Sequence, residues 1–590
     1  MMKPDCKLLR LLRSPLPWRL LRSPLPWLLL AIAWTWPAAL HPVSAAPGSA
    51  HTDLWESLWT LWFVATRLAA GQLPIHVDGL MESTHAGSLW PADLIGAITM
   101  APITLTAGPA VSWTLLVIGH MTLRGCLGAQ IGALYAQGAA GPNDPDGARA
   151  GASSAGAAAA AGAVTGMILA LAPIALAGVH NGASEVLGDT WSIAVVWMGL
   201  RYAPGWRWTA LAGVVLGIAA WAHWYGGLVA FCIWGVMTLR RGLPGIARRA
   251  FILAGIVGAL IAAPGAYAAK TISTAKDNVV GIKDPRELNN VRRTIGPADP
   301  WALVRPAPFR SPDLSTISRY GEDHFHCPYL GWVGLALTGY GVLRGRRGWA
   351  LWLLPIGIGL AIGPVLTAGG EPVILSGRRA VPLPYFLLEK LPPFNTLSLL
   401  WKLAWAAEIG VALSAARGLA ALLQRIGGPR TTAPKTAGQA GGLVMGLVTA
   451  VFVGGIALEA GFVAPTRGLP RSVDASIPAP IQALQAEPEG TVMTWPLIGG
   501  LPTLYEQVAH HKTVASTLNF PASKNAWKVT RAVKSGREAT LSIARQAGIR
   551  YVVLHLDATT IGDESGLQLA DWDHFPVLVE DTRVRVLRLW

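Results

Sequence analysis

The run AAAAAGAVTGMILALAPIALAG, Ala157–Gly178, carries no charged side chain. A transmembrane helix needs about 20 such residues to cross the ~30 Å hydrocarbon core of a bilayer. Comparable apolar segments recur on both sides of this run. We expect about eleven transmembrane helices, at residues 25–45, 106–126, 157–178, 187–202, 208–222, 225–240, 250–269, 328–343, 349–366, 396–417 and 441–463. The sequence therefore predicts a mainly α, polytopic membrane protein.

Composition supports this fold class and excludes several functions. The 590 residues are 52% hydrophobic and 14% charged, whereas soluble domains are about 25% charged. The net charge of +15 does not indicate nucleic-acid binding, because the basic residues lie in short segments between apolar runs, without a basic stripe that aromatic residues interrupt. The four cysteines lack the CxxC spacing of a zinc or redox site.

Charge also predicts the orientation. Basic residues precede the first run and gather in alternate connections, such as Arg240–Arg241 and Arg344–Arg347. By the positive-inside rule, these segments and the N-terminus are cytoplasmic. We therefore expect a multi-pass protein of the inner (cytoplasmic) membrane with outer loops at 47–105, 270–327 and 367–395. A cleavable signal peptide is the alternative for the first run, because VSAA at Val43–Ala46 resembles a cleavage site.

The composition changes after residue 463. Residues 464–590 contain β-rich runs, such as Tyr551–Leu556, and helical stretches at Lys524–Val533 and Ala539–Gln546. Val577–Glu580 and Val584–Leu589 predict a hairpin. We interpret 1–463 as a transmembrane helical domain and 464–590 as a small α/β domain. An odd number of spans places that small domain outside the cytoplasm.

The first outer loop holds the strongest candidate for chemistry. On a helical wheel, Asp53, Glu56, Ser57, Thr60 and Arg67 form one polar stripe on an otherwise apolar helix. Such a helix is typical of one that lies on a membrane surface. The whole loop carries five acidic residues (Asp53, Glu56, Asp78, Glu82 and Asp93) against one basic residue. A cluster of this kind suits a general base or a divalent cation, although no DxD spacing specifies a metal. The alternative is that these carboxylates only solvate the helix.

Polar residues near or inside the spans give further candidates. Lys402 and Glu408 fall within a predicted span, where an unpaired charge costs several kcal/mol. Lys402 either contacts a phosphate group or extends to the membrane surface. His180, with Glu185 and Asp189 following, could line the same cavity as the first loop.

Several motifs together resemble a known superfamily. They are AAGQLPIHVDGL (Ala69–Leu80), GSLWPADL (Gly87–Leu94), LPYFLLEKLPPF (Leu383–Phe394), GTVMTWPLIGG (Gly490–Gly500) and GIRYVVLH (Gly548–His555). In this order they are similar to the GT-C superfamily of glycosyltransferases that use polyprenyl-phosphate sugars, and especially to YfhO-like bacterial membrane proteins. Two departures stand out. The early acid lies in HTDLWES rather than in a paired motif, and LSLLWK (Leu397–Lys402) replaces an arginine-containing motif and keeps only its last basic position.

The resemblance implies a function and a set of site residues. It implies transfer of a sugar from a polyprenyl phosphate to an envelope glycan, lipid or protein acceptor on the outer face of the membrane. It places Asp53 at the position of the catalytic carboxylate. The resemblance keeps a basic position at Lys402, and the charged and polar residues themselves give the candidate substrate contacts: Glu56, Asp78, Lys402, Arg378, Arg379 and His180. A transporter or flippase of an envelope lipid or glycan, or a non-catalytic scaffold, is the alternative. The first-loop arrangement occurs only once, whereas many transporters contain inverted repeats, and this favours the enzyme.

Overall fold

A computed structural model describes most of the chain. The described residues are 23–50, 52–74, 93–137, 151–240, 245–274, 292–293, 296–305, 327–368, 371–375, 379–391, 394–427, 435–463, 472–496, 503–515, 529, 532–533, 535–556 and 567–590. The predicted site residues Asp78 and Arg378 lie outside them, as do most of the helical stretch predicted at Lys524–Val533 and the acidic residue Glu82.

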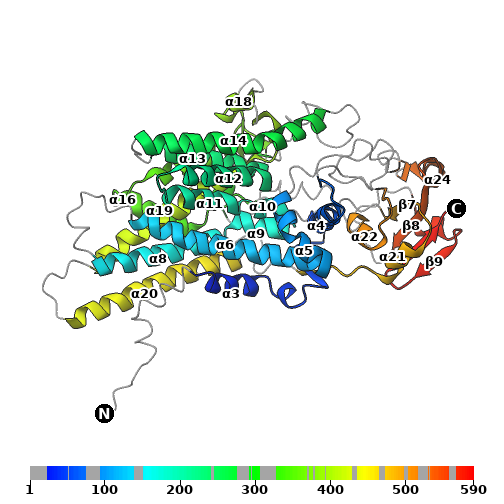
Figure 1. Ribbon diagram of the computed structural model, residues 1–590, viewed down its shortest axis with the longest axis horizontal. Coiled ribbons are helices and arrows are strands. Elements are labelled where there is room, and N and C mark those ends of the chain that lie inside the picture. The colour runs from blue at the N-terminus through cyan, green and yellow to red at the C-terminus, as the bar shows by residue number, and fades with distance from the viewer. Residues whose placement is uncertain are drawn as a thin grey trace, which may run out of the picture.

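A helical bundle forms most of the molecule (Figure 1). Its helices are α3 (Leu25–Trp34), α5 (Leu94–Ala107), α6 (Pro109–Gln137), α8 (Gly151–Ala170), α9 (Pro173–His180), α10 (Ser184–Leu187), α11 (Thr190–Leu200), α12 (Trp206–Ala222), α13 (Trp224–Arg240), α14 (Gly245–Thr274), α16 (Trp332–Leu343), α17 (Leu353–Ala361), α19 (Ala404–Gly427) and α20 (Lys435–Leu458). Among the described residues, five helical segments are long and apolar enough to cross a membrane: Pro109–Gln137, Ala155–His180, Gly245–Tyr267, Leu400–Ile426 and Gly442–Gly461. Six shorter apolar helices accompany them, so the number of eleven spans stays a prediction.

Small residues bring the central helices together. Helix α6 packs along α8, and α8 packs along α19. A Cβ atom on Gly162 of α8 would lie 2.4 Å from the carbonyl oxygen of Ala129 in α6, so a larger side chain could not be accommodated there. The alanine- and glycine-rich sequence of α8 thus permits the close helix contact that packing in a membrane favours.

One predicted boundary is wrong. The first apolar run was expected to be helical over 25–45, but α3 ends at Trp34 and the chain continues into a short strand, β1 (Ala45–Pro47). Pro37 and Pro42 supply no N–H group, which explains the early end of the helix. Helix α5 begins at Leu94, within the predicted first outer loop, where the Asp93 side chain accepts a hydrogen bond from the Gly96 backbone N–H at 2.8 Å.

The third predicted loop contains short regular elements. Two small hairpins pair β2 (Thr367–Ala368) with β3 (Glu371–Pro372), and β4 (Ile374–Leu375) with β5 (Arg379–Ala380). Helix α18 (Tyr385–Leu388) follows.

The C-terminal residues form a four-stranded sheet in the order β7-β8-β10-β9. Strands β7 (Thr491–Trp495) and β8 (Ile549–His555) are parallel, and β10 (Val584–Arg588) runs antiparallel to both β8 and β9 (Val577–Glu580). The predicted hairpin is therefore confirmed. Helices α21 (Ala479–Ala483), α22 (Thr503–His510) and α24 (Arg537–Gln546) accompany the sheet.

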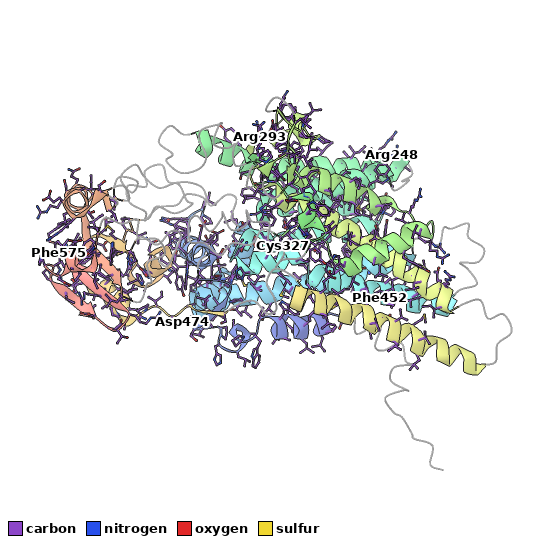
Figure 2. The ribbon with its side chains drawn as sticks, turned by 180° about the vertical axis from the view of Figure 1, so that it is seen from behind. Arg248, Arg293, Cys327, Phe452, Asp474 and Phe575 are labelled. Atoms are coloured by element: carbon purple, nitrogen blue, oxygen red, sulfur yellow. The ribbon has the colours of Figure 1, made fainter. Side chains whose placement is uncertain are left out.

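The sheet lies at one end of the bundle, and helix α4 (Leu54–Ala69) lies between the two (Figure 1). A second connection is the pairing of β1 with β6 (Ser472–Asp474). Figure 2 shows Asp474 at this junction, Phe575 on the sheet and Arg248 at the far end of the bundle.

Candidate functional site

Helix α4 is confirmed, but its surroundings differ from the expected membrane surface. Its aromatic side chains Trp55, Trp59 and Phe63 are buried in protein. On one side α4 contacts α5 and α6, and on the other it contacts α22, where the Trp59 indole N–H donates a 2.7 Å hydrogen bond to Gln507. The amphipathic pattern predicts a helix with its apolar face in the membrane and its polar face in water. In the structure, α4 lies between two protein surfaces instead.

The turn after α9 fixes the start of α4. The Ser57 hydroxyl donates a 2.6 Å hydrogen bond to the carbonyl of Gly182. Gly182 has a φ of +65°, and a Cβ atom there would lie 2.2 Å from the Leu54 Cα. The carbonyl of buried His180 accepts a 2.9 Å hydrogen bond from the Ser49 N–H. These contacts place Asp53, the residue before α4, beside the segment that joins α9 to α11.

Lys402 lies at the centre of the charged groups in this region. It belongs to a single 3₁₀ turn, Leu400–Leu403, that leads into α19. Its Nζ donates a 2.9 Å hydrogen bond to Glu185 of α10 and lies 5.5 Å from the centre of the Tyr225 ring. The Asp53 carboxylate also interacts electrostatically with this ammonium group. The structure therefore brings together two predicted residues, Asp53 and Lys402, with Glu185, which was only a minor candidate.

The two nearby carboxyl groups have opposite electrostatic environments. Burial raises the pKa of Glu185, but the charges of Lys402 and His223 and the hydrogen bond from Lys402 outweigh burial and lower that pKa to about 2. Burial raises the pKa of Asp93 to about 7, against the lowering effect of the Gly96 N–H, and the negative charge of Glu185 adds to the increase. Lys402 therefore favours the ionised form of Glu185, whereas burial favours the neutral form of Asp93.

A buried polar network supports α10. Arg124 of α6 donates hydrogen bonds to the Val186 carbonyl at 2.6 Å and to the Thr190 hydroxyl at 2.9 Å, and its guanidinium lies 5.2 Å from the centre of the Trp405 ring. His120 reaches the same Thr190 hydroxyl at 2.9 Å. Arg124 therefore bonds to both ends of the segment from Val186 to Thr190, which follows Glu185.

Three further ionisable groups extend the network. The His223 Nδ1 lies 2.7 Å from the Asp189 carboxylate, and both side chains are buried. Glu408 is 1% exposed and interacts electrostatically with Arg124 and Asp189, while its Oε1 has no hydrogen-bond partner among the described residues. Glu408 and Lys402, six positions apart, thus have different charged neighbours.

Two further predicted residues, Glu56 and Arg379, lie within the described ranges. Glu56 is half-buried in the first turn of α4, close in sequence to Asp53. Arg379 belongs to β5, which gives its backbone position only. Two other arginines near this region bond to protein groups: Arg292 donates to the Leu397 carbonyl at 2.8 Å, and Arg293 pairs with Glu389 at 2.9 Å.

A metal site is not visible in the described part of the chain. Within those ranges, no group of three or more His, Cys, Asp or Glu side chains has the geometry to hold a metal ion. A divalent cation thus stays an untested expectation.

Comparison with solved structures identifies the fold of the chain. No protein-family model and no curated protein matches the chain. Among solved structures, the arabinofuranosyltransferase AftD from Mycobacteria aligns with a TM-score of 0.50 at 14% identity, covering 95% of this chain and 41% of AftD. The chain has the GT-C fold. It spans less than half the length of AftD, and the likeness to YfhO-like proteins in particular stays a prediction.

Two further solved structures are similar to this chain. The oligosaccharyltransferase AglB from Archaeoglobus fulgidus, in complex with an inhibitory peptide and a dolichol-phosphate, is 12% identical with a TM-score of 0.48, and the match covers 94% of this chain and 72% of AglB. ArnT from Cupriavidus metallidurans, bound to undecaprenyl phosphate, is 12% identical with a TM-score of 0.36, and the match covers 96% and 97% of the two chains.

One important residue, Arg124, was not predicted from the sequence. Arg124 lies in an apolar helix, and its 1% exposure marks it as a buried charge. An ionisable residue in a predicted span suggests a functional or structural partner, so this signal was present in the run 106–126. The partners themselves come from α10 and α11, more than sixty positions away, which no local pattern reveals.

Proposed function

We propose that the chain is an integral membrane glycosyltransferase that moves a sugar from a polyprenyl-phosphate donor to a cell-envelope acceptor. The observation that carries this proposal is that Lys402, in the turn before α19, bonds to Glu185 of α10 and interacts electrostatically with Asp53, the residue before α4. The GT-C fold supports it. Glycosyl transfer needs a base and a group that binds the phosphate. The Asp53 carboxylate can supply the first and the Lys402 ammonium group the second.

The chemistry assigns each group one task. The Asp53 carboxylate accepts the proton of the acceptor hydroxyl, and the hydroxyl oxygen forms a bond to the anomeric carbon of the donor sugar. The bond between that carbon and the phosphate oxygen breaks, and its electron pair leaves with the lipid phosphate. An ammonium group has three donors, so Lys402 can bind a phosphate oxygen while it keeps its bond to Glu185.

The proposed topology puts this site at the outer face of the inner membrane. The site is at the end of the bundle that carries the C-terminal sheet (Figure 1). Basic residues such as Arg248 lie at the opposite end (Figure 2), which the positive-inside rule assigns to the cytoplasm. A lipid-linked donor in the outer leaflet would then meet Lys402, and the C-terminal α/β unit would lie outside the cytoplasm.

The test is to compare two neighbouring carboxylates of α4. We expect Asp53→Asn to lower sugar transfer by about 100-fold or more, because general-base catalysis contributes that much. Glu56→Gln should lower transfer less than Asp53→Asn does, because Glu56 has no counterpart in the resemblance. The measurement is transfer from a polyprenyl-phosphate sugar by purified protein in nanodiscs, with protein level and membrane insertion checked for both variants. Near-normal and equal activity of the two variants would remove Asp53 from catalysis.

A further inference from the structure

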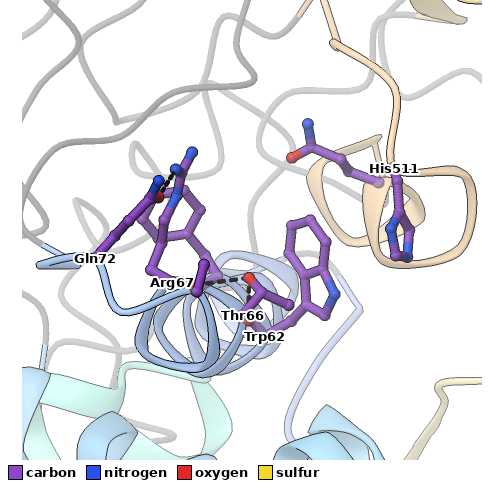
Figure 3. Close-up of a pocket in the computed structure, with 8 residues that line it drawn as sticks. Trp62, Thr66, Arg67, Gln72 and His511 are labelled. Atoms are coloured by element: carbon purple, nitrogen blue, oxygen red, sulfur yellow. Dashed lines mark hydrogen bonds between the residues drawn. The ribbon is translucent and has the colours of Figure 1, made fainter.

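A small pocket opens between α4 and α22, away from the charged site (Figure 3). Its volume is about 200 Å³, enough for a small group such as one sugar ring. It is lined by Trp62, Phe63, Thr66, Arg67, Ala70, Gln72, Gln507 and His511. The hydrogen bond between Trp59 and Gln507 holds the two walls together, so the pocket is part of the packed structure.

The lining combines flat aromatic faces with planar polar groups. Trp62 and His511 lie with ring centres 5.6 Å apart, in an edge-to-face arrangement. The Arg67 guanidinium lies 5.2 Å from the centre of the Phe63 ring and bonds to the Gln72 side-chain oxygen. Aromatic faces pack against apolar C–H groups, while guanidinium and amide groups donate several hydrogen bonds in one plane. A sugar ring presents both kinds of surface, C–H groups on its faces and hydroxyls around its edge.

The position of the pocket defines what part of a substrate it could hold. Asp53 precedes the first residue of α4, and Thr66 lies thirteen residues later, so they are separated by about 20 Å along the helix at 1.5 Å per residue. A sugar in this pocket cannot be the one that reacts beside Asp53. It can be another unit of the same chain.

We propose that this pocket binds a sugar unit of an extended acceptor glycan, several units away from the hydroxyl that reacts. This inference rests on the proposed function for the identity of the acceptor, and it narrows that acceptor to a glycan chain. The pocket fixes the distant part of the chain, and α4 carries both the pocket and the catalytic carboxylate, so that one rigid element sets the separation between them.

The first experiment measures binding without turnover. The probes are neutral hexasaccharides of mannan, arabinan and glucan, added to the full-length Asp53→Asn protein in nanodiscs and followed by saturation-transfer NMR. We expect at least one probe to bind, and Trp62→Ala to weaken that binding by about tenfold, the effect of losing one aromatic contact. Gln72→Ala, at an exposed position, should weaken it in the same direction without disturbing the fold. Leu68→Ala, an exposed α4 residue outside the pocket lining, should leave it unchanged.

The second experiment measures length dependence in the active protein. In wild type, the ratio of kcat/KM for a hexasaccharide acceptor to that for a disaccharide should exceed one. Trp62→Ala should bring this ratio towards one, and Leu68→Ala should not. Binding of no hexasaccharide, or equal binding by the Trp62→Ala and Leu68→Ala proteins, would overturn the pocket proposal even if transfer occurs. Trp62-dependent binding without any sugar transfer would support the pocket and contradict the glycosyltransferase.

Discussion

At the scale of single residues, Lys402 and Glu185 decide whether the charged cluster is a site or a structural ion pair. Lys402→Met should abolish donor binding, because the phosphate loses its cation, and it should also lower stability by about 1–3 kcal/mol by leaving Glu185 without its partner. Lys402→Arg should retain or improve binding, since a guanidinium presents a bidentate fork to phosphate. The measurements are binding of a polyprenyl-phosphate sugar in nanodiscs and the thermal unfolding midpoint.

The double variant Lys402→Met with Glu185→Gln separates the two roles. It removes both charges, so it should regain much of the lost stability. Donor binding should remain lost if Lys402 contacts phosphate. Recovery of both stability and donor binding would show that the pair is only structural.

The raised pKa of Asp93 predicts that the stability of the protein depends on pH. Its carboxyl group, which lies before α5 and outside the five long spans, has a pKa of about 7 in the folded protein against 3.8 for an ordinary aspartate. The unfolded chain therefore releases this proton at lower pH than the folded protein does. The resulting stability is complete below pH 4 and is lost as pH rises to about 7.

The matched comparison is Asp93→Asn, which keeps an oxygen to accept the Gly96 N–H and does not titrate. The unfolding midpoint of wild type should fall relative to that of Asp93→Asn between pH 4 and pH 7, and the difference should then level off. A difference that stays constant over this range would contradict the burial of a neutral Asp93.

Single residues were predicted unevenly from the sequence. Asp53 and Lys402 could be proposed from an acidic loop and a charge inside an apolar run, and the structure places them near each other. Glu185 could not be ranked above the other acids, because its importance depends on the 2.9 Å contact with a lysine 217 positions away. The sugar pocket was not predicted at all, since its walls come from segments that are separated by more than 400 residues.

At the scale of elements, the turn between α9 and α10 positions α4. Gly182→Ala would combine a strained positive φ with a Cβ atom 2.2 Å from the Leu54 Cα, so α4 must move away from the turn. Gly71→Ala is the matched control, because Gly71 has a φ of +70° and no atom within 4 Å of the added Cβ. Both should lose about 1 kcal/mol through backbone strain.

Gly182→Ala should in addition lower sugar transfer, since displacement of α4 moves Asp53 relative to Lys402. The readouts are thermal stability and transfer activity in nanodiscs. Equal activity of the Gly182→Ala and Gly71→Ala proteins would mean that the contact between α4 and this turn does not determine the position of Asp53 relative to Lys402.

Helices could be predicted well from apolar runs, and their interruptions less well. The run expected at 157–178 is helical, but it divides into α8 and α9 at Pro173, a residue that cannot continue the hydrogen bonds of a helix. The amphipathic pattern of α4 correctly predicted a helix. It could not distinguish lipid from protein as the neighbour, because both environments bury the same apolar side chains.

At the scale of the whole molecule, the orientation in the membrane is the next prediction. Alkaline phosphatase fused after Asp474, beyond α20, should be active, and the same fusion after Gly427, at the end of α19, should be inactive. Alkaline phosphatase folds only outside the cytoplasm. Colony colour and phosphatase activity per unit of fusion protein therefore report on which side of the membrane each fusion point lies. The reverse pattern would put the proposed site on the cytoplasmic side and exclude an outer-leaflet donor.

Composition and hydropathy were sufficient to predict a polytopic helical protein, and the GT-C fold agrees with the resemblance in the first loop. The number of spans could not be settled in the same way. Six of the apolar helices are shorter than the length that crosses a bilayer, and the tilt or partial insertion of such a helix depends on its neighbours rather than on its own residues.

The most direct test of the central claim is the analysis of lipid-linked sugars and envelope glycans by mass spectrometry in a strain that lacks this protein. We predict that a polyprenyl-phosphate sugar accumulates and that one envelope glycan loses the corresponding residue. The wild-type gene should reverse both changes, whereas the Asp53→Asn gene should reverse neither. Unchanged lipid-linked sugars and glycans in the deletion strain, or full rescue by Asp53→Asn, would contradict a glycosyltransferase that uses Asp53 as its base.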